Sequence, residues 1–153
     1  MSGVYLIVWD EGQKDRSPLL KPTKGGWPHI TVAYTGEFLP LPDLVKTAQL
    51  CFGSWSLKEV VLQQAYVNSF EEKQSGSMRH DVLLKLSDAD TQAIETTRDP
   101  YLRVFGNAEK FAMRTPHVTH SIHSTLEEAQ AVVCSLNLDH LPYRVNVTGV
   151  TVD

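Results

Sequence analysis

The chain has 153 residues, of which 42% are hydrophobic and 21% are charged, and its formal net charge is −4. A chain of this length can bury roughly two thirds of its unfolded surface, so we expect one domain that spans the whole chain and needs no staples. No stretch approaches the roughly 20 apolar residues that cross a bilayer, which excludes a membrane-spanning protein. The negative charge disfavours a protein that grips long duplex nucleic acid, because such binding normally takes a continuous basic surface.

The first third of the chain predicts two strands and a helix. Val4–Trp9 is rich in β-branched and aromatic residues, and a charged loop containing prolines and glycines follows over residues 10–27. His29–Tyr34 predicts the second strand. Pro42–Cys51 has apolar residues at helical spacing and a proline at its start, which predicts an amphipathic helix.

The middle of the chain predicts a hairpin followed by a short helix. Leu57–Phe70 and Arg79–Leu86 both have strand-like composition, and the break between them contains Gly76. A helix over about residues 88–98 follows, capped by a serine or aspartate at its start. We expect Asp99–Pro100 to end this helix, because the residue before a proline avoids the helical conformation.

The last third predicts a strand, a helix and a final strand. His117–Ile122 is the strand, and Ser124–Leu136 has two glutamates in its first turn, as a helix N-terminus prefers. Tyr143–Val152 is the last strand. Each half of the chain therefore predicts a strand, a helix and a second strand, which indicates an internal duplication within an α+β fold.

The two cysteines favour a reducing compartment. Cys51 and Cys134 both fall late in predicted helices rather than in a closely spaced framework, which is typical of reduced, buried thiols. The apolar run at the N-terminus lacks a basic segment before it and is too short for a signal peptide. We therefore expect a cytoplasmic protein, and we expect it to be a monomer.

A repeated tetrapeptide is the most informative motif. Pro-His-Ile-Thr at residues 28–31 returns as Pro-His-Val-Thr at residues 116–119, and each copy begins a predicted strand. Residues two apart on a strand point to the same face, so each imidazole should emerge beside a hydroxyl. The predicted catalytic residues are His29, Thr31, His117 and Thr119.

Two histidines that face each other across a pseudo-twofold axis suit phosphodiester cleavage. Histidine titrates near neutrality, so one imidazole can accept a proton while its partner donates one. The base would activate water or a ribose hydroxyl, and the acid would protonate the departing alkoxide. The threonine hydroxyls would hydrogen-bond the nonbridging phosphoryl oxygens, and neither step requires a metal.

The residues that flank the motifs predict a phosphorylated ligand. Lys21 and Lys24 precede the first motif and Arg114 precedes the second, on loops that could fold over an anion. Trp27 and Tyr5 could stack on a nucleobase. Each cation could equally be a solvated surface charge, and for Tyr5 core packing is favoured over stacking, because large aromatic side chains usually serve burial.

Further histidines surround the second motif. By strand alternation His123 lies on the face of His117 and could contact substrate, whereas His120 points to the opposite face. A zinc site is disfavoured because this alternation separates His120 from the other two, so we expect no metal and no cofactor. His80 and His140 lie in no motif and are predicted to be ordinary surface or hairpin residues.

The double motif resembles that of the 2H phosphoesterase superfamily, which is named for its two histidines. The matching segments are Pro28–Val32 and Pro116–His120, and the second has a histidine where the family usually has an apolar residue after the threonine. The resemblance implies a two-lobed, pseudo-twofold α+β fold in which antiparallel sheets line a central cleft and helices lie outside. It also implies that the four motif residues are catalytic.

The motif and the resemblance together predict a metal-independent phosphodiesterase that acts on a 2′,3′-cyclic phosphate or a 2′-linked phosphodiester. Its substrate would be a small nucleotide, a cyclic or 2′,5′-linked oligonucleotide, or an RNA end. Two alternatives remain open: a viral or phage-type enzyme that degrades cyclic oligonucleotide or 2′,5′-oligoadenylate immune signals, and a nucleotide- or RNA-binding module without turnover. A further alternative is a structural α+β domain in which the histidines are core residues and have no catalytic or binding role.

Overall fold

The computed structural model describes residues 3–9, 20, 28–34, 42, 46, 59–105 and 115–152. Within these residues the elements are β1 (Gly3–Trp9), β2 (His29–Tyr34), β3 (Glu59–Glu71), β4 (Met78–Leu86), α2 (Asp88–Phe105), β5 (His117–His123), α4 (Leu126–Asp139) and β6 (Tyr143–Val152). Each of these strands was predicted from the sequence to within a few residues at its ends. The predicted helix at Pro42–Cys51 lies outside the described residues except for Pro42 and Lys46, which are helical.

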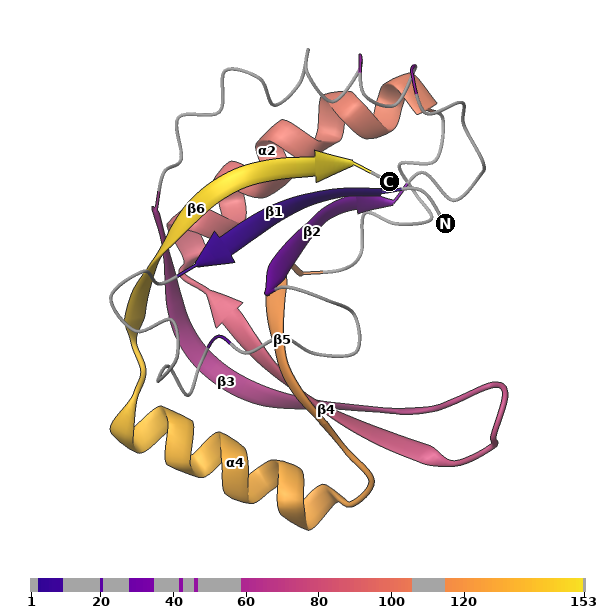
Figure 1. The fold of residues 1–153 in the computed structure, drawn as a ribbon, viewed down its shortest axis with the longest axis vertical. Helices are drawn as coiled ribbons and strands as arrows, with labels where there is room; N and C mark the ends of the chain where they lie inside the picture. Colours follow the sequence, from indigo (N-terminus) through magenta and orange to yellow (C-terminus); the bar gives the residue numbers. More distant parts are fainter. Residues whose placement is uncertain are drawn as a thin grey trace.

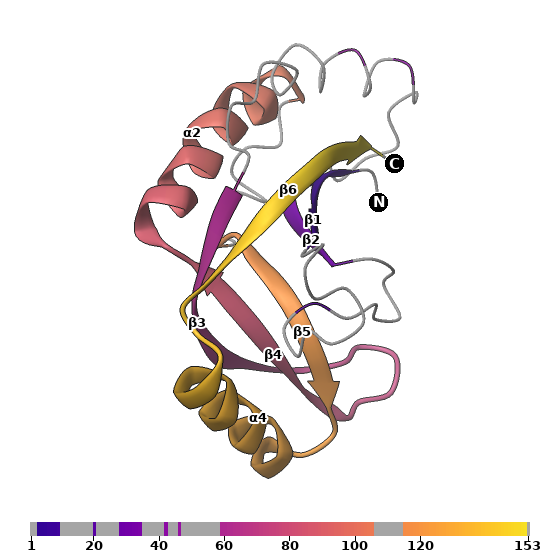
Figure 2. The same cartoon turned by 60° about the vertical axis from the view of Figure 1, so that its left-hand side comes forward.

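The strands form one closed antiparallel ring in the order β1-β2-β5-β4-β3-β6 (Figure 1). Figure 2 shows α2 and α4 along one margin of the strands. Ile94 of α2 and Ala129 and Leu136 of α4 are buried in the same core as the strands. The predicted α+β class, antiparallel pairing and outer helices are therefore confirmed.

Two pseudo-equivalent lobes make up the ring. The first lobe consists of β6, β1 and β2, and the second consists of β3, β4 and β5, in matching spatial order. The third strand of each sequence half thus lies in the lobe of the other half. A pseudo-twofold axis passes between β2 and β5, where Ile30 pairs with Val118.

Four β-bulges follow the same symmetry. Val32 of β2 and His120 of β5 are extra residues opposite β1 and β4, and each comes directly after a motif threonine. Thr148 of β6 and Gln63 of β3 are likewise extra residues opposite β1 and β4. Because a bulge shifts the register by one residue, these matched bulges give both lobes the same twist and register. The predicted duplication is therefore present in the backbone, although the sequences of the lobes diverge.

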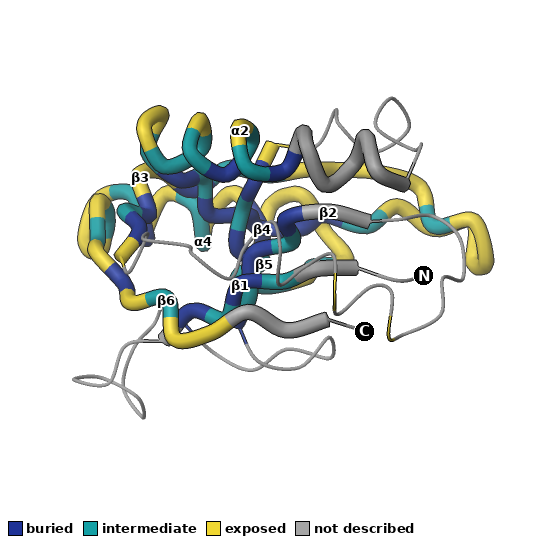
Figure 3. The backbone as a smooth tube through the Cα atoms, turned by 90° about the horizontal axis from the view of Figure 1, so that it is seen from above, coloured by how far each residue is buried: buried dark blue, intermediate teal, exposed yellow. Residues whose placement is uncertain are grey.

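A continuous row of apolar side chains crosses both lobes at the axis. It comprises Leu6, Ile30, Val118, Leu84 and Ala65, which are neighbours on five successive strands. None of them exposes more than 1% of its surface. Figure 3 shows the buried segments of these strands meeting in the middle of the molecule. We call the side of the strands that carries this row the core face.

The helix α2 differs from the sequence prediction at its end. The prediction that Asp99–Pro100 stops the helix is wrong, since α2 continues to Phe105. A proline inside a helix removes one backbone hydrogen bond and favours a kink, but it does not forbid the helix. Burial of Ile94 and Arg98 against the strands fixes the turns before the proline. Tertiary packing outweighs the local preference here.

Two other local predictions have different outcomes. The helix α4 begins as predicted, because the Thr125 side chain accepts a hydrogen bond from the Glu128 backbone nitrogen and acidic residues occupy the first turn. Cys134 was predicted to be buried, and that prediction is wrong, since the thiol lies on the exposed side of α4. In the described part of the chain, no helix is long and apolar enough to cross a bilayer.

Candidate functional site

The two motif strands meet at the pseudo-twofold axis. Antiparallel pairing of Ile30 with Val118 turns both of these residues to the core face, so the residues on either side of them point to the opposite face, which we call the site face. Pro28 and Pro116, which begin the two motifs, are both buried. The four predicted catalytic residues on the site face are His29, Thr31, His117 and Thr119, and all four are half-buried.

These four side chains form a small square. In the antiparallel register around the axis, His29 lies beside Thr119 and Thr31 lies beside His117. Direct cross-strand neighbours have Cβ atoms about 5 Å apart and diagonal neighbours lie about 7–8 Å apart. The two imidazoles are therefore on one diagonal and the two hydroxyls on the other. This spacing allows one phosphoryl group to contact all four side chains.

The imidazole of His117 has a fixed orientation. Its Nδ1 lies 2.9 Å from the backbone oxygen of Thr115. A carbonyl oxygen only accepts, so Nδ1 carries the hydrogen and donates it. The other ring nitrogen, Nε2, is then the one that can take up or release a proton. The second motif thus leaves a single titrating nitrogen for chemistry.

Tyr5 contacts the first histidine. Its ring meets the His29 ring edge-to-face, with 5.3 Å between the ring centroids. In the register of β1 and β2, Tyr5 pairs with Thr31 and Ile7 pairs with His29, so both belong to the site face. The Tyr5 ring is half-buried at the rim of the square rather than packed in the core. The first lobe therefore borders the motif residues with one aromatic and one aliphatic side chain.

The second lobe borders the square with a cation. Lys85 of β4 pairs with His117, and Leu83 pairs with Thr119. The Lys85 side chain is 43% exposed, and its only ion pair among the described residues is at 3.8 Å to the fully exposed Asp88. Such an exposed pair is weak and easily exchanged for another anion. An ammonium group is thus available next to the square.

Two residues of β3 extend the site face further. Gln64 pairs with Lys85 and Tyr66 pairs with Leu83. Tyr66 is half-buried, and this burial raises the pKa of its phenol above the ordinary value. Neither Lys85 nor Tyr66 was predicted from the sequence, because their place beside the motif residues depends on the pairing of β4 with β5 and of β3 with β4, and the bulge at Gln63 also decides the face of Tyr66. The hairpin register was the signal that could have identified them.

His123 does not lie on the site face. The alternation that put it beside His117 is wrong, because the bulge at His120 reverses the alternation after Thr119. Thr119 and Ser121 pair with consecutive residues of β4, so Ser121 and His123 point to the core face. The reason for expecting His123 to contact substrate therefore disappears.

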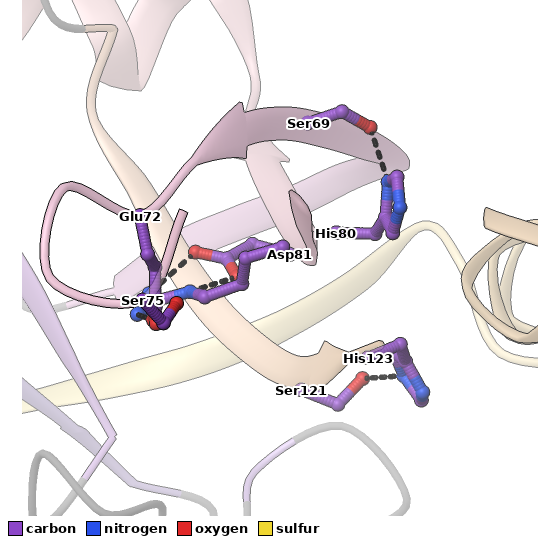
Figure 4. Close-up of polar contacts among 8 residues, drawn as sticks. Ser69, Glu72, Ser75, His80, Asp81, Ser121 and His123 are labelled. Atoms are coloured by element: carbon purple, nitrogen blue, oxygen red, sulfur yellow. Dashed lines mark hydrogen bonds and ion pairs between the residues drawn. The ribbon is translucent and has the colours of Figure 1, made fainter. Parts of the chain in front are cut away.

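The contacts of His123 agree with this placement. Its Nε2 lies 2.8 Å from the Ser121 hydroxyl (Figure 4). Its Nδ1 lies 3.7 Å from a carboxylate oxygen of Glu128 on α4. His120 also contacts Ser121, at 2.8 Å, and so points away from the square as predicted. His117 and His123 thus face opposite sides of the sheet and cannot share a metal ion. Among the described residues, no group of three His, Cys, Asp or Glu side chains could hold one.

His80 was predicted to be an ordinary surface or hairpin residue. It does lie on the hairpin, but it is 9% exposed, and its Nδ1 lies 2.6 Å from the Ser69 hydroxyl across the strand pair (Figure 4). The surface prediction is therefore wrong for His80, which is a hydrogen-bonded residue of the core face. His140 follows α4 and is exposed, as predicted.

An acidic cluster bounds the site face at the hairpin. Asp81 is the next site-face residue of β4 after Leu83, and it is 6% exposed. Arg79 holds Asp81 through two hydrogen bonds of 2.7 and 2.8 Å, contacts Glu72 at 3.1 Å and stacks on the Phe70 ring. These bonds, that to Asp81 first, raise the pKa of Arg79 above its already high value. Two carboxylates against one guanidinium leave this end of the face negative.

Three residues predicted to bind substrate, Lys24, Trp27 and Arg114, lie outside the described residues, as does Lys21. Their roles stay predictions from the sequence. The site can therefore be assembled from β1, β2, β3, β4 and β5 only.

Two solved structures of one protein align with almost the whole chain. The chain is similar to Usb1. The structure of Kluyveromyces marxianus Usb1 aligns with a TM-score of 0.47 and 13% identity, covering 99% of this chain and 96% of that one. Kluyveromyces marxianus Usb1 with uridine monophosphate aligns with a TM-score of 0.49 and 14% identity over the same shares. No protein-family model and no curated protein sequence matches the chain.

Proposed function

We propose that this protein is a phosphodiesterase of the 2H type that uses two histidines and no metal. Its reaction would be the opening of a 2′,3′-cyclic phosphate, or the cleavage of a 2′-linked phosphodiester, in a small nucleotide, an oligonucleotide or an RNA end. The observation that carries the proposal is the pairing of the two motif strands at Ile30 and Val118, which sets both imidazoles and both hydroxyls on one face.

The chemistry follows from that square. One histidine in its neutral form removes a proton from water or a ribose hydroxyl, whose oxygen then bonds to phosphorus. The other histidine, protonated, gives its proton to the leaving oxygen as the phosphorus–oxygen bond breaks. Thr31 and Thr119 donate hydrogen bonds to the nonbridging oxygens, where negative charge must be held in the transition state. After one turnover the two histidines have exchanged protonation states, and solvent restores them.

His117 suits either role, because only its Nε2 faces away from the Thr115 carbonyl. The bond from Nδ1 persists whether the ring is neutral or protonated, so the ring need not reorient during turnover. Two groups that must hold opposite protonation states predict a bell-shaped dependence of kcat/KM on pH.

The test uses single His29→Ala and His117→Ala variants, with the exposed His140→Ala as a matched control. Substrates are 2′,3′-cyclic nucleotides, linear 2′,5′-oligoadenylate and cyclic oligonucleotides, so that the panel also separates RNA-end processing from degradation of an immune signal. We expect each motif variant to lose about 10²- to 10⁴-fold in kcat while it stays folded, and the control to keep wild-type rates. Wild-type rates in both motif variants would overturn the proposal. Affinity for AMP or CMP by calorimetry without any turnover would indicate a binding module instead.

A further inference from the structure

The two lobes differ most in the residues that border the motif square. Under the pseudo-twofold axis, the position of Lys85 opposite His117 corresponds to that of Ile7 opposite His29. The position of Tyr66 on β3 corresponds to Thr151 on β6, since the matched bulges keep the register of both lobes. The second lobe thus places a cation opposite its motif histidine where the first places an aliphatic side chain, and its strand β3 adds a large aromatic ring to the site face.

We propose that Lys85 and Tyr66 form a binding subsite for the nucleotide next to the reacting phosphate, so that the preferred substrate is an oligonucleotide rather than a cyclic mononucleotide. This inference rests on the proposed phosphodiesterase function. The Lys85 ammonium binds the neighbouring backbone phosphate, and the Tyr66 ring stacks on the base.

The geometry fits one nucleotide. The strands β5 and β3 are two positions apart in the sheet, so the motif residues and Tyr66 are separated by about 10 Å. Leu83, which is 5% exposed, lies between Thr119 and Tyr66 and provides an apolar floor for a base. The Tyr66 phenol is neutral at physiological pH, because the ordinary pKa of a tyrosine is about 10 and burial raises it further, so the ring adds no negative charge beside a phosphate.

The charges give the subsite a direction. Within the part of the chain that the structure describes, the Lys85 ammonium has one ion pair, the exchangeable contact to Asp88, and a phosphate can replace that carboxylate. Farther along β4, the acidic cluster of Asp81, Glu72 and Arg79 would repel a polyanion. A bound chain should therefore run across the strands from the square towards Tyr66, and not along the hairpin.

The test compares two substrates that end in the same reacting group: 2′,3′-cyclic UMP, and a uridine trinucleotide that ends in a 2′,3′-cyclic phosphate. The measured quantity is kcat/KM for the trinucleotide divided by kcat/KM for 2′,3′-cyclic UMP. In Lys85→Gln and Tyr66→Leu we expect this ratio to fall at least about tenfold, which is within the range for losing a charge-assisted or stacking contact. Tyr66→Phe should keep the wild-type ratio, because it keeps the ring.

Two controls match these changes elsewhere on the molecule. Lys73→Gln removes the same charge at the exposed hairpin turn, and Phe70→Leu removes a ring from the same strand face beyond the acidic cluster. Both should keep the wild-type ratio. A wild-type ratio in Lys85→Gln and Tyr66→Leu would overturn the subsite while leaving the phosphodiesterase intact. Lys85→Gln decides the matter if Tyr66→Leu fails to fold, because the lysine side chain is exposed.

A binding measurement separates failure of the subsite from failure of the proposed function. If the wild-type protein cleaves neither these two substrates nor any member of the wider panel, the phosphodiesterase proposal fails, and calorimetry with the 3′-phosphorylated uridine trinucleotide tests the subsite directly. An affinity at least about tenfold weaker in Lys85→Gln than in wild type supports it. Equal affinity, or no binding to the wild-type protein, overturns it.

Discussion

The two lobes have matching backbone arrangements, but the side chains on their site faces differ. On the core face, Ile30 and Val118 meet at the axis, and their neighbours Leu6 and Leu84 continue the same buried row into each lobe. On the site face, the lobes agree in their histidines and threonines and differ in everything that borders them. Packing and the four matched bulges therefore keep the lobes equivalent where the motif residues must meet. The lobes differ around the motif residues, where contacts with a bound substrate would distinguish one end of that substrate from the other.

This contrast gives a direction to an otherwise symmetric site. In the proposed reaction, a phosphoryl group held by two equivalent imidazoles would have no preferred orientation, so any preference must come from the flanks. The first lobe has Tyr5 against His29, and the second has Lys85 opposite His117. These different flanks would let one histidine serve consistently as base and the other as acid.

The largest expected effect comes from breaking the row that both lobes share. Ile30→Ala should lower the free energy of unfolding by about 2–5 kcal/mol, because Ile30 is fully buried at the axis and its loss leaves a cavity. Urea denaturation measures this. The control is Ile122→Ala, whose side chain is 44% exposed and should change stability by less than about 0.5 kcal/mol. Equal losses in the two variants would contradict a core that joins the lobes.

The hydroxyls test whether the lobes are equivalent at the square. Thr31→Val and Thr119→Val remove one hydroxyl each at nearly constant shape, and we expect each to lower kcat by about 10²-fold. Thr→Ser at either position should restore most of the rate, because the hydroxyl returns. Steady-state kinetics on a 2′,3′-cyclic nucleotide provides the measurement. A large loss at one position and none at the other would show that only one lobe holds the phosphoryl oxygens.

The sequence predicts the fold and the square well because both depend on local patterns. The β-branched runs predict each described strand, and the repeated tetrapeptide identifies the four residues that the axis brings to one face. The period of two along a strand puts the histidine and the threonine of each motif on one face. The meeting of the two motifs also needs the pairing of Ile30 with Val118, which the internal repeat suggests but does not fix.

What the sequence could not predict depends on register and packing. Alternation failed at His123 because nothing local predicts the bulge at His120, and one extra residue exchanges the two faces. Tyr66 was missed for the same reason, since the bulge at Gln63 decides its face. The helix α2 continues beyond Pro100 because buried residues stabilise the helical turns before the proline. The sequence predictions thus failed at positions where a tertiary contact overrides a local preference.

The outer strand of the second lobe provides a smaller test. Pairing of β3 with β6 covers only Glu59–Leu62, and beyond it the Asn137 side chain of α4 bonds both backbone groups of Ala65, at 2.8 and 3.2 Å. Asn137→Ala should cost about 1–3 kcal/mol of the free energy of unfolding, because it leaves that buried backbone unsatisfied. The exposed Asn68→Ala on the same strand is the control, and urea denaturation measures both. No difference between them would mean that α4 does not secure this edge.

The smallest expected effect again separates the lobes, at the position where the second has Tyr66 and the first has a threonine that does not titrate. Burial raises the pKa of Tyr66 in the folded protein, whereas the unfolded chain ionises near the ordinary value of about 10. The unfolded state therefore loses its proton first, and the contribution of Tyr66 to stability is complete below about pH 10 and declines as the pH rises further. In Tyr66→Phe this decline is absent, while the other tyrosines titrate as before. The stability difference between wild type and Tyr66→Phe, measured by urea denaturation at pH 8.5 and at about pH 10.5, should shift in favour of the variant at the higher pH. A difference that stays constant would mean that the ring is as solvated as a free phenol, and a ring so exposed would be a poor platform for a base.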